Sequence, residues 1–196
     1  AEAPAMPAEM GSSDDLYLTG LHLEQYRHPT REPQIYWEEA LRRDGGDSRC
    51  NNAMGRWHLR RGELDLAEKH LRAAIARLQR RNLNPYDGEA FYNLGLVLLY
   101  RNDIAGAYDS FYKATWNAAW ASPSYQRLAE IDCRNTEWNT ALDHVDRSLK
   151  QNAENLNALN LKALILQKLE RRDEARDVLV YFVIKNRESC LLQLCK

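Results

Sequence analysis

The residues with the greatest capacity for chemistry, the histidines and cysteines, are scattered along this chain of 196 residues. No two histidines stand four residues apart, the spacing that places two imidazoles on one helical face for a metal ion. The cysteines form no CxxC pair, and their irregular spacing does not indicate a disulfide framework. We therefore expect no metal, no cofactor and reduced thiols, as in a cytoplasmic protein. The residues concerned are His22, His28, His58, His70, His144, Cys50, Cys133, Cys190 and Cys195.

The sequence also lacks the patterns of nucleophilic catalysis and nucleotide binding. It contains no GxSxG elbow, no P-loop and no GxGxxG. Paired acids such as Asp14-Asp15 and Glu38-Glu39 are interpreted as helix-surface or helix-start charge. The run RRDGGD at 42–47 ends an expected helix and is preceded by no strand, so it predicts a turn and not a phosphate-binding loop. We predict that the chain is not an enzyme.

Aromatic side chains could stack on sugars or bases, and the chain has five tryptophans and ten tyrosines. Most of them recur at positions that predict packing between helices. Tyr17, Tyr92 and Tyr100 are the exceptions, because the helical period turns them to the opposite side.

Composition narrows the classes of partner. The formal net charge is -1, from 27 basic and 28 acidic residues, which predicts no attraction to nucleic acid or to an anionic membrane. The longest apolar run, near Gly95–Leu99, is far shorter than the ~20 residues that span a bilayer. A protein or peptide, or a neighbouring domain of a longer polypeptide, is the expected partner.

The elements that must position any functional side chain are helical hairpins. Between Asp87 and Trp120, two apolar stripes of helical period flank a polar break at 101–103. Small residues recur in the first helix of this hairpin and of others at intervals of 35, 40, 34 and 34 residues, and we call them anchors: Gly20, Gly55, Gly95, Ala129 and Ala163. Twelve residues after four of them stand Ala67, Ala107, Ala141 and Ala175. A repeat of this period predicts stacked hairpins.

Local signals predict where some helices begin. Ser122 before Pro123 favours a helix start, because the hydroxyl can accept a free backbone N–H and proline fits the first turn. Asp103, Thr136 and Asp173 are expected at or near the starts of second helices. The interval of 40 residues predicts a longer connection with a turn at Asn84-Pro85.

The spacing of small and large apolar residues resembles the tetratricopeptide repeat (TPR) family. The third unit matches it best, with Phe91, Leu94, Gly95, Leu98, Ala107, Phe111 and Ala114. The resemblance implies an all-α fold, a right-handed α-solenoid of about five helix-turn-helix repeats plus a short C-terminal helix. The expected organisation is a flexible linker or tag-like segment at 1–13, repeats at 14–47, 48–86, 87–121, 122–155 and 156–187, and a capping or truncated helix at 188–196.

In that family the first helices line a concave groove, and the side chains three before, one after and five after each anchor point into it. Such a mixture of amide, aromatic and cationic groups suits an extended peptide. The alternative is an ordinary hydrated surface. The corresponding residues are Tyr17, Leu21, Gln25, Asn52, Arg56, Arg60, Tyr92, Leu96, Tyr100, Gln126, Glu130, Arg134, Asn160, Leu164 and Lys168.

A second resemblance concerns the opening YLTGLHLEQYRHPTREPQIYWEEALRRD and the later segments NPYDGEAFYNLGL and YDSFYKATWNAAW. They are similar to the helical-repeat region of large bacterial proteins of uncharacterised function with an N-terminal carbohydrate-associated β-sandwich. The leading hypothesis is a non-enzymatic protein-interaction or scaffold module. The alternative is a structural support of a larger carbohydrate-active polypeptide that contributes one wall of a sugar site. An end repeat with exposed apolar residues would permit self-association.

Overall fold

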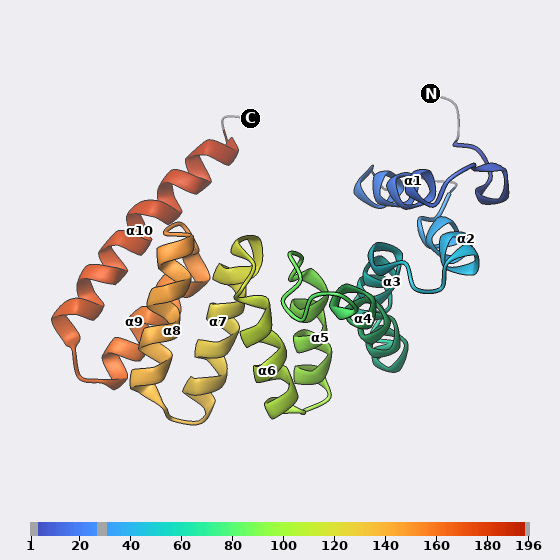
Figure 1. The fold of residues 1–196 in the computed structure, drawn as a ribbon. Helices are drawn as coiled ribbons and strands as arrows, with labels where there is room; N and C mark the ends of the chain where they lie inside the picture. The colour runs from blue at the N-terminus through green and yellow to red at the C-terminus, as the bar shows by residue number, and fades with distance from the viewer. Residues whose placement is uncertain (1–3, 27–30, 195–196) are drawn as a thin grey trace. The chain divides into compact units, whose positions relative to one another are not determined.

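This computed structural model describes residues 4–26 and 31–194, and it describes the side chains as far as Ile184. The described residues form ten α-helices and one short 3₁₀ helix, and they contain no strand (Figure 1). The all-α prediction is confirmed, and the succession of helices is consistent with an α-solenoid of helical repeats. His28 and the last two residues lie outside the described residues.

The helices belong to two compact units, Ala1–Asp103 and Ile104–Lys196, which are considered separately and are called the N-terminal and C-terminal units. Among the described helices, none combines the length and the apolar character that crossing a membrane requires. The N-terminal unit holds η1 (Pro7–Glu9), α1 (Ser13–Tyr26), α2 (Gln34–Arg43), α3 (Ser48–Arg60), α4 (Leu64–Gln79) and α5 (Glu89–Tyr100). The C-terminal unit holds α6 (Ile104–Ala114), α7 (Ala118–Arg134), α8 (Trp138–Gln151), α9 (Leu156–Lys168) and α10 (Arg172–Leu194).

Close approach of helices at the anchors explains the hairpins of the N-terminal unit. A Cβ atom added to Gly55 on α3 would lie 2.5 Å from Cγ of Leu71 on α4, too close for any real contact. A Cβ on Gly20 would likewise overlap the indole of Trp37 on α2. Both large side chains are completely buried. Each anchor is therefore small because a large side chain of the second helix packs directly against it.

The C-terminal unit is packed in the same manner around alanines. Ala129 on α7 and Ala141 on α8 share a buried cluster with Val145, Ala158 and Ile165. The pairs α7 with α8, α8 with α9 and α9 with α10 are in contact. Small side chains at the crossing again let large neighbours fill the space around them.

The turns between first and second helices share one backbone geometry. The residue seven positions after the anchor has a positive φ in four of them: Gly62 (74°), Asn102 (63°), Thr136 (61°) and Glu170 (60°). The next amide donates back to the last turn of the first helix, for example Glu137 N to Asp132 O at 2.9 Å. A residue in the left-handed backbone conformation and this hydrogen bond together end the first helix. The prediction that Thr136 caps α8 is therefore wrong, because its backbone ends α7 and its hydroxyl donates to Asn135 O.

The start of α7 also differs from the prediction. The helix begins at Ala118, where the side chain of Asn117 accepts the amide of Ala119 at 3.1 Å, so Ser122 and Pro123 lie inside it. Asn117 caps one turn earlier than the Ser-Pro pair, and the helix tolerates the missing N–H of proline. Ser122 is buried instead, and its carbonyl accepts the hydroxyl of Ser148 on α8 at 2.8 Å. Asp173 does lie in the first turn of α10.

The two ends of the chain differ from the expected organisation. Helix α10 is one continuous helix through Leu194, so residues 188–194 extend it and form no separate short helix. The reason is that no glycine or proline interrupts residues 172–194. Residues 4–12, expected as a linker, contact α2: Tyr36 donates to Ala5 O at 2.9 Å and Arg43 to Met10 O at 2.7 Å.

Candidate functional site

An arginine on α3 joins three first helices of the N-terminal unit. Arg56 donates from Nη1 to Glu89 on α5 at 2.8 Å and from Nη2 to Glu24 on α1 at 2.6 Å. Glu24 also accepts a hydrogen bond from Arg60, which lies one turn further along α3. One nitrogen of Arg60 is therefore paired, while 53% of its side chain remains exposed.

Two predicted groove residues of the N-terminal unit lie in its interior contacts. Asn52 is buried, and its Oδ1 accepts Nδ2 of the buried Asn93 at 3.1 Å. Tyr17 is half-buried beneath Arg49, whose guanidinium carbon lies 5.0 Å from the ring centre. Burial and the nearby Glu89 raise the pKa of Tyr17. These two residues hold α1, α3 and α5 together more than they face solvent.

Of the remaining predicted residues of the N-terminal unit, the half-buried Leu21 and the exposed Gln25 lie on α1, and the other three come from α5. Tyr92 and Leu96 are half-buried, whereas 69% of Tyr100 is exposed. Leu96 and Tyr100 line a hollow of about 610 Å³, which we call the second hollow. Its other walls come from the end of α3, the following turn and the start of α4: Leu59, Arg60, Gly62 and Leu64.

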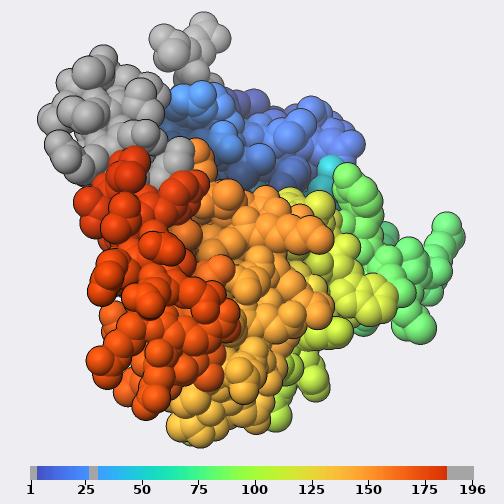
Figure 2. Space-filling view, turned by 90° about the vertical axis from the view of Figure 1, so that its left-hand side faces the viewer, coloured from blue at the N-terminus to red at the C-terminus, as the bar shows by residue number. Residues whose placement is uncertain are grey.

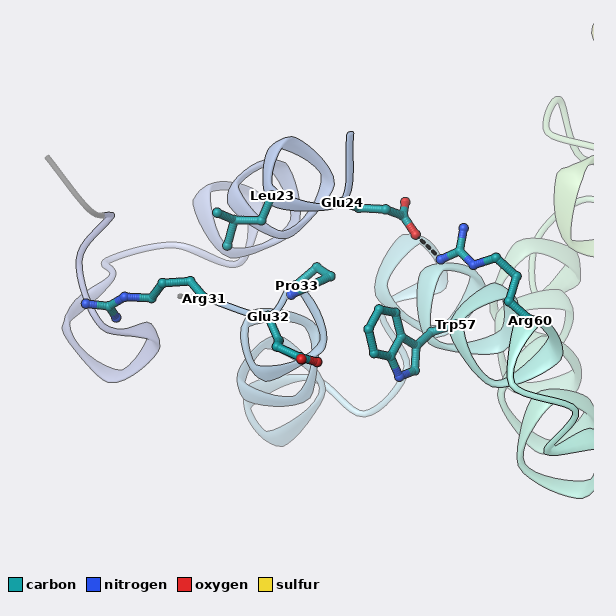
Figure 3. Close-up of a pocket in the computed structure, with 7 residues that line it drawn as sticks. All are labelled: Leu23, Glu24, Arg31, Glu32, Pro33, Trp57 and Arg60. Atoms are coloured by element: carbon teal, nitrogen blue, oxygen red, sulfur yellow. Dashed lines mark hydrogen bonds and ion pairs between the residues drawn. The ribbon is translucent and has the colours of Figure 1, made fainter. Parts of the chain in front are cut away.

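Arg60 also lines another hollow, of about 400 Å³, which we call the first hollow. Figure 3 shows Trp57 and Arg60 of α3 on one side and Leu23, Pro33 and Glu32 on the facing side, with Arg31 turned away from Trp57. The dashed contact in the figure is the ion pair of Arg60 with Glu24. Sequence reasoning missed Trp57 and Pro33, because they lie at the edges of the hairpins and not at the positions assigned to the groove.

In the C-terminal unit, two predicted residues form a polar cluster. Gln126 donates to Glu130 at 2.8 Å and accepts Nδ2 of Asn155 at 3.0 Å. Arg127 also donates to Glu130, at 2.8 Å. These groups use much of their hydrogen-bonding capacity on one another.

The other four predicted residues of the C-terminal unit are exposed: Arg134, Asn160, Leu164 and Lys168. The ammonium of Lys168 lies 6.0 Å from the ring centre of Trp138. In the N-terminal unit, by contrast, Arg60, Leu96 and Tyr100 line one hollow. The structure therefore brings the predicted residues together more completely in the N-terminal unit.

Two polar pairs, one buried and one half-buried, were not predicted. On α7 and α8, Nδ1 of His144 donates to Asp132 at 2.6 Å, and both side chains are buried. At the same repeat positions on α3 and α4, the rings of His58 and His70 stack with centres 5.4 Å apart. Their common spacing from the anchors, three and fifteen residues, was the available signal. The described residues hold no group of three or more histidine, cysteine or acidic side chains arranged for a metal ion.

Comparison with known proteins identifies the fold. No family model matches the chain. The solved structure of MamA is similar, with a TM-score of 0.70 and 16% identity over 92% of this chain and 96% of that one. PilF of Pseudomonas aeruginosa gives 0.76 and 20% over 88% and 76%. YrrB, a TPR protein with an unusual peptide-binding site, gives 0.67 and 14% over 94% and 91%. The chain thus has the fold of TPR proteins, as the repeat spacing predicted.

Proposed function

We propose that this chain is a protein-interaction module that binds an extended peptide of a partner protein on the first-helix side of the N-terminal unit and performs no chemistry itself. The second hollow carries this proposal: its walls are largely leucine and tyrosine, its rim holds one arginine, and Tyr100 is mostly exposed. Tyrosine supplies a large, rigid contact area at low entropic cost. The peptide-binding site of YrrB, on the same fold, supports the proposal.

The hollow is formed by regular elements and is therefore available before a partner arrives. Leu59 and Arg60 lie on α3, and Leu96 and Tyr100 lie on α5. The hydrogen bonds of Arg56 on α3 with Glu24 and Glu89 link α3 to α1 and α5. A surface that needs no rearrangement loses less binding free energy to ordering. Such a surface suits a flexible peptide, because the peptide is then the partner that loses conformational entropy on binding.

The test is selection of peptides from a displayed random library on the immobilised chain, followed by fluorescence anisotropy with a labelled selected peptide. We expect saturable binding that Tyr100→Ala weakens about 10-fold or more, since aromatic anchors dominate interface energies. The matched control is Tyr86→Ala, which changes a tyrosine that is 95% exposed on the connection before α5. Failure to select any peptide, or equal weakening by both variants, would refute the proposal.

The carbohydrate alternative has its own experiment on the same protein. A glycan titration is followed by tryptophan fluorescence in the unchanged chain and in Tyr92→Ala. A saturable signal that this substitution abolishes would favour a sugar site over a peptide site, because tyrosine rings stack on sugar faces. The attachment to a β-sandwich domain and the cytoplasmic location stay predictions.

A further inference from the structure

We propose that the first and second hollows act together as a two-anchor site for a peptide with two large apolar side chains about three residues apart and an acidic side chain between them. The inference rests on the proposed function and adds the chemistry of the partner. Arg60, which lines both hollows, is the residue that the acidic side chain would reach.

The two hollows occupy equivalent places in the repeat. The first lies where the first hairpin meets α3, and the second where the α3–α4 hairpin meets α5. Arg60 stands five residues after Gly55, and Tyr100 stands five residues after Gly95. Each of these side chains therefore lines the hollow at which its own helix meets the preceding hairpin. Equivalent places in a repeat present equivalent surfaces at a regular distance.

Both hollows have apolar walls. Leu23, Pro33 and the indole of Trp57 line the first, and four apolar side chains line the second: Leu59, Leu64, Leu96 and Tyr100. Their volumes, about 400 and 610 Å³, lie in the range of roughly 300–1,000 Å³ that small ligands occupy. Each hollow has room for one aromatic or leucine side chain of a peptide.

The distance between the hollows sets the spacing of the two anchors. Packed helices lie about 8–10 Å apart. An extended peptide in the polyproline II conformation advances roughly 3.1 Å per residue and completes a turn every three residues, so side chains three apart point to the same side. One step along the repeat thus corresponds to about three peptide residues. A helical peptide would advance only about 1.5 Å per residue and would need a longer interval.

Charge complementarity identifies the group between the anchors. Arg60 uses one nitrogen for Glu24, and that carboxylate is shared with Arg56. Arg56 has a second carboxylate partner in Glu89, whereas Arg60 shares the carboxylate of Glu24 with Arg56. A guanidinium has further N–H donors that match a second carboxylate, and 53% of the Arg60 side chain is exposed to receive it. Glu32, on the far rim of the first hollow, disfavours an acidic group there and places it near Arg60.

The experiment uses fluorescein-labelled nine-residue peptides of serine, threonine and glycine that carry two phenylalanines and one aspartate between them. The phenylalanines are placed two, three, four or five residues apart, and binding to the whole chain is measured by anisotropy. We expect the three-residue spacing to bind at least about 5-fold more tightly than the others, since a misplaced anchor loses most of one buried side chain. Replacement of the aspartate by lysine is expected to weaken binding about 10-fold, the range of a charge-assisted hydrogen bond.

Variants of the protein assign each contact. In Arg60→Gln the preference for aspartate over lysine is expected to disappear, whereas it persists in Arg72→Gln, whose arginine is 57% exposed on α4. In Tyr100→Ala, truncation of one peptide phenylalanine to alanine is expected to change affinity less than about 2-fold, because its hollow is already lost. Circular dichroism of each variant confirms that it is folded.

The outcomes separate this inference from the proposed function. If library-selected peptides bind through Tyr100 but affinity does not depend on anchor spacing or on the acidic residue, the two-anchor site is refuted and the peptide-binding function stands. If Arg72→Gln removes the charge preference as Arg60→Gln does, the assignment of Arg60 is refuted. If neither designed nor selected peptides bind, both proposals fail.

Discussion

Thr136 adopts a backbone conformation that β-branched residues rarely occupy. Its φ of 61° is repeated by Gly62, for which the same conformation is free of steric cost. A non-glycine residue held there costs about 1–3 kcal/mol, which the turn between α7 and α8 absorbs. Part of that cost is offset by the entropy that glycine would lose on folding.

We therefore expect Thr136→Gly to stabilise the protein by about 1 kcal/mol. The measurement is the free energy of unfolding from urea titration followed by circular dichroism. Thr140→Gly, at an exposed position inside α8, is the control and is expected to destabilise by about 0.5–1 kcal/mol. A loss of stability in Thr136→Gly would show that the threonine side chain contributes more than its conformation costs.

The buried Asp132–His144 pair is a second feature at the residue scale. The carboxylate of Asp132 accepts a hydrogen bond from Nδ1 of His144 on α8. Burial, together with this carboxylate, raises the pKa of Tyr108 on α6 to about 12. Removing one member of a buried hydrogen-bonded pair leaves the other unsatisfied and costs about 1–3 kcal/mol. We expect a loss of that size in Asp132→Ala, measured by urea unfolding.

The repeat itself supplies the control for this prediction. The equivalent positions of the last hairpin hold Leu166 and Val178, an apolar pair. The double variant Asp132→Leu with His144→Val copies that pair, and it should recover at least half of the stability lost in Asp132→Ala, because an apolar pair can replace both partners of a buried hydrogen bond at little cost. A double variant as unstable as the single one would mean that Tyr108 depends on the carboxylate for its place.

His70 makes the stability of the N-terminal unit depend on pH. Burial, and then the positive charge of a protonated His58, lower the pKa of His70 from its ordinary value of about 6.5. Asn51 donates both amide hydrogens to backbone carbonyls, so its Oδ1 accepts Nδ1–H of His70 at 2.9 Å. The folded chain therefore keeps this imidazole neutral at a pH where the unfolded chain protonates it.

Because the pKa is lower in the folded state, the contribution of His70 is fully present above about pH 6.5 and is lost as the pH falls below it. We expect the free energy of unfolding to decrease as the pH falls below about 6.5, and His70→Gln to reduce that slope. His22→Gln, which changes an exposed histidine of α1, should leave it unaltered. An unchanged slope in His70→Gln would assign the pH dependence to other groups.

At the scale of elements, the hairpins depend on the size of the anchor. In Gly55→Ala the added methyl group would overlap Leu71, which is completely buried. Overpacking of this kind costs about 1–3 kcal/mol, more than the ~1 kcal/mol that alanine gains over glycine within a helix. We expect net destabilisation in thermal unfolding. Gly11→Ala is the control, because nothing lies within 4 Å of its added carbon, and a similar loss there would remove the argument for close approach.

The same elements show how much the sequence could predict. Anchors and hairpins were predictable because a small residue facing a large one is a local steric requirement that recurs with the period. The start of α7 was not, because two caps competed and Asn117 stands one turn before Ser122. The contacts of Arg56 with Glu24 and Glu89 join residues 32 and 33 positions apart, and they depend on how neighbouring hairpins are aligned. For the same reason Trp57 and Pro33 were not assigned to a site, while Tyr100 and Leu96 were.

At the scale of the molecule, the last helix presents an apolar surface. Val180, Tyr181, Val183 and Ile184 are each at least 40% exposed on α10, the helix that faces the viewer in Figure 2. Contiguous apolar surface of this kind is typical of interaction sites. It supports the prediction that the chain associates with itself through an end repeat, whereas the apolar side chains at 190–194 lie outside the described side chains.

We expect sedimentation velocity to show a concentration-dependent dimer that Val180→Glu and Ile184→Lys each shift to monomer. A charge placed in an apolar interface is desolvated without a partner. The control is Arg176→Glu, which changes a charge on the same helix outside the apolar group. Monomeric behaviour of the unchanged chain at high concentration would refute self-association by this surface.

The arginine that reaches from α3 to both neighbouring first helices has a consequence for the history of the repeats. Arrays of this kind grow and shrink when whole cassettes are copied or deleted. Excision of the α3–α4 cassette would remove Arg56 and set Glu24 against Glu89, two like charges with no cation between them. Duplication would create a second arginine with only one acidic neighbour. The contacts of Arg56 therefore favour keeping the α3–α4 cassette between its two neighbours.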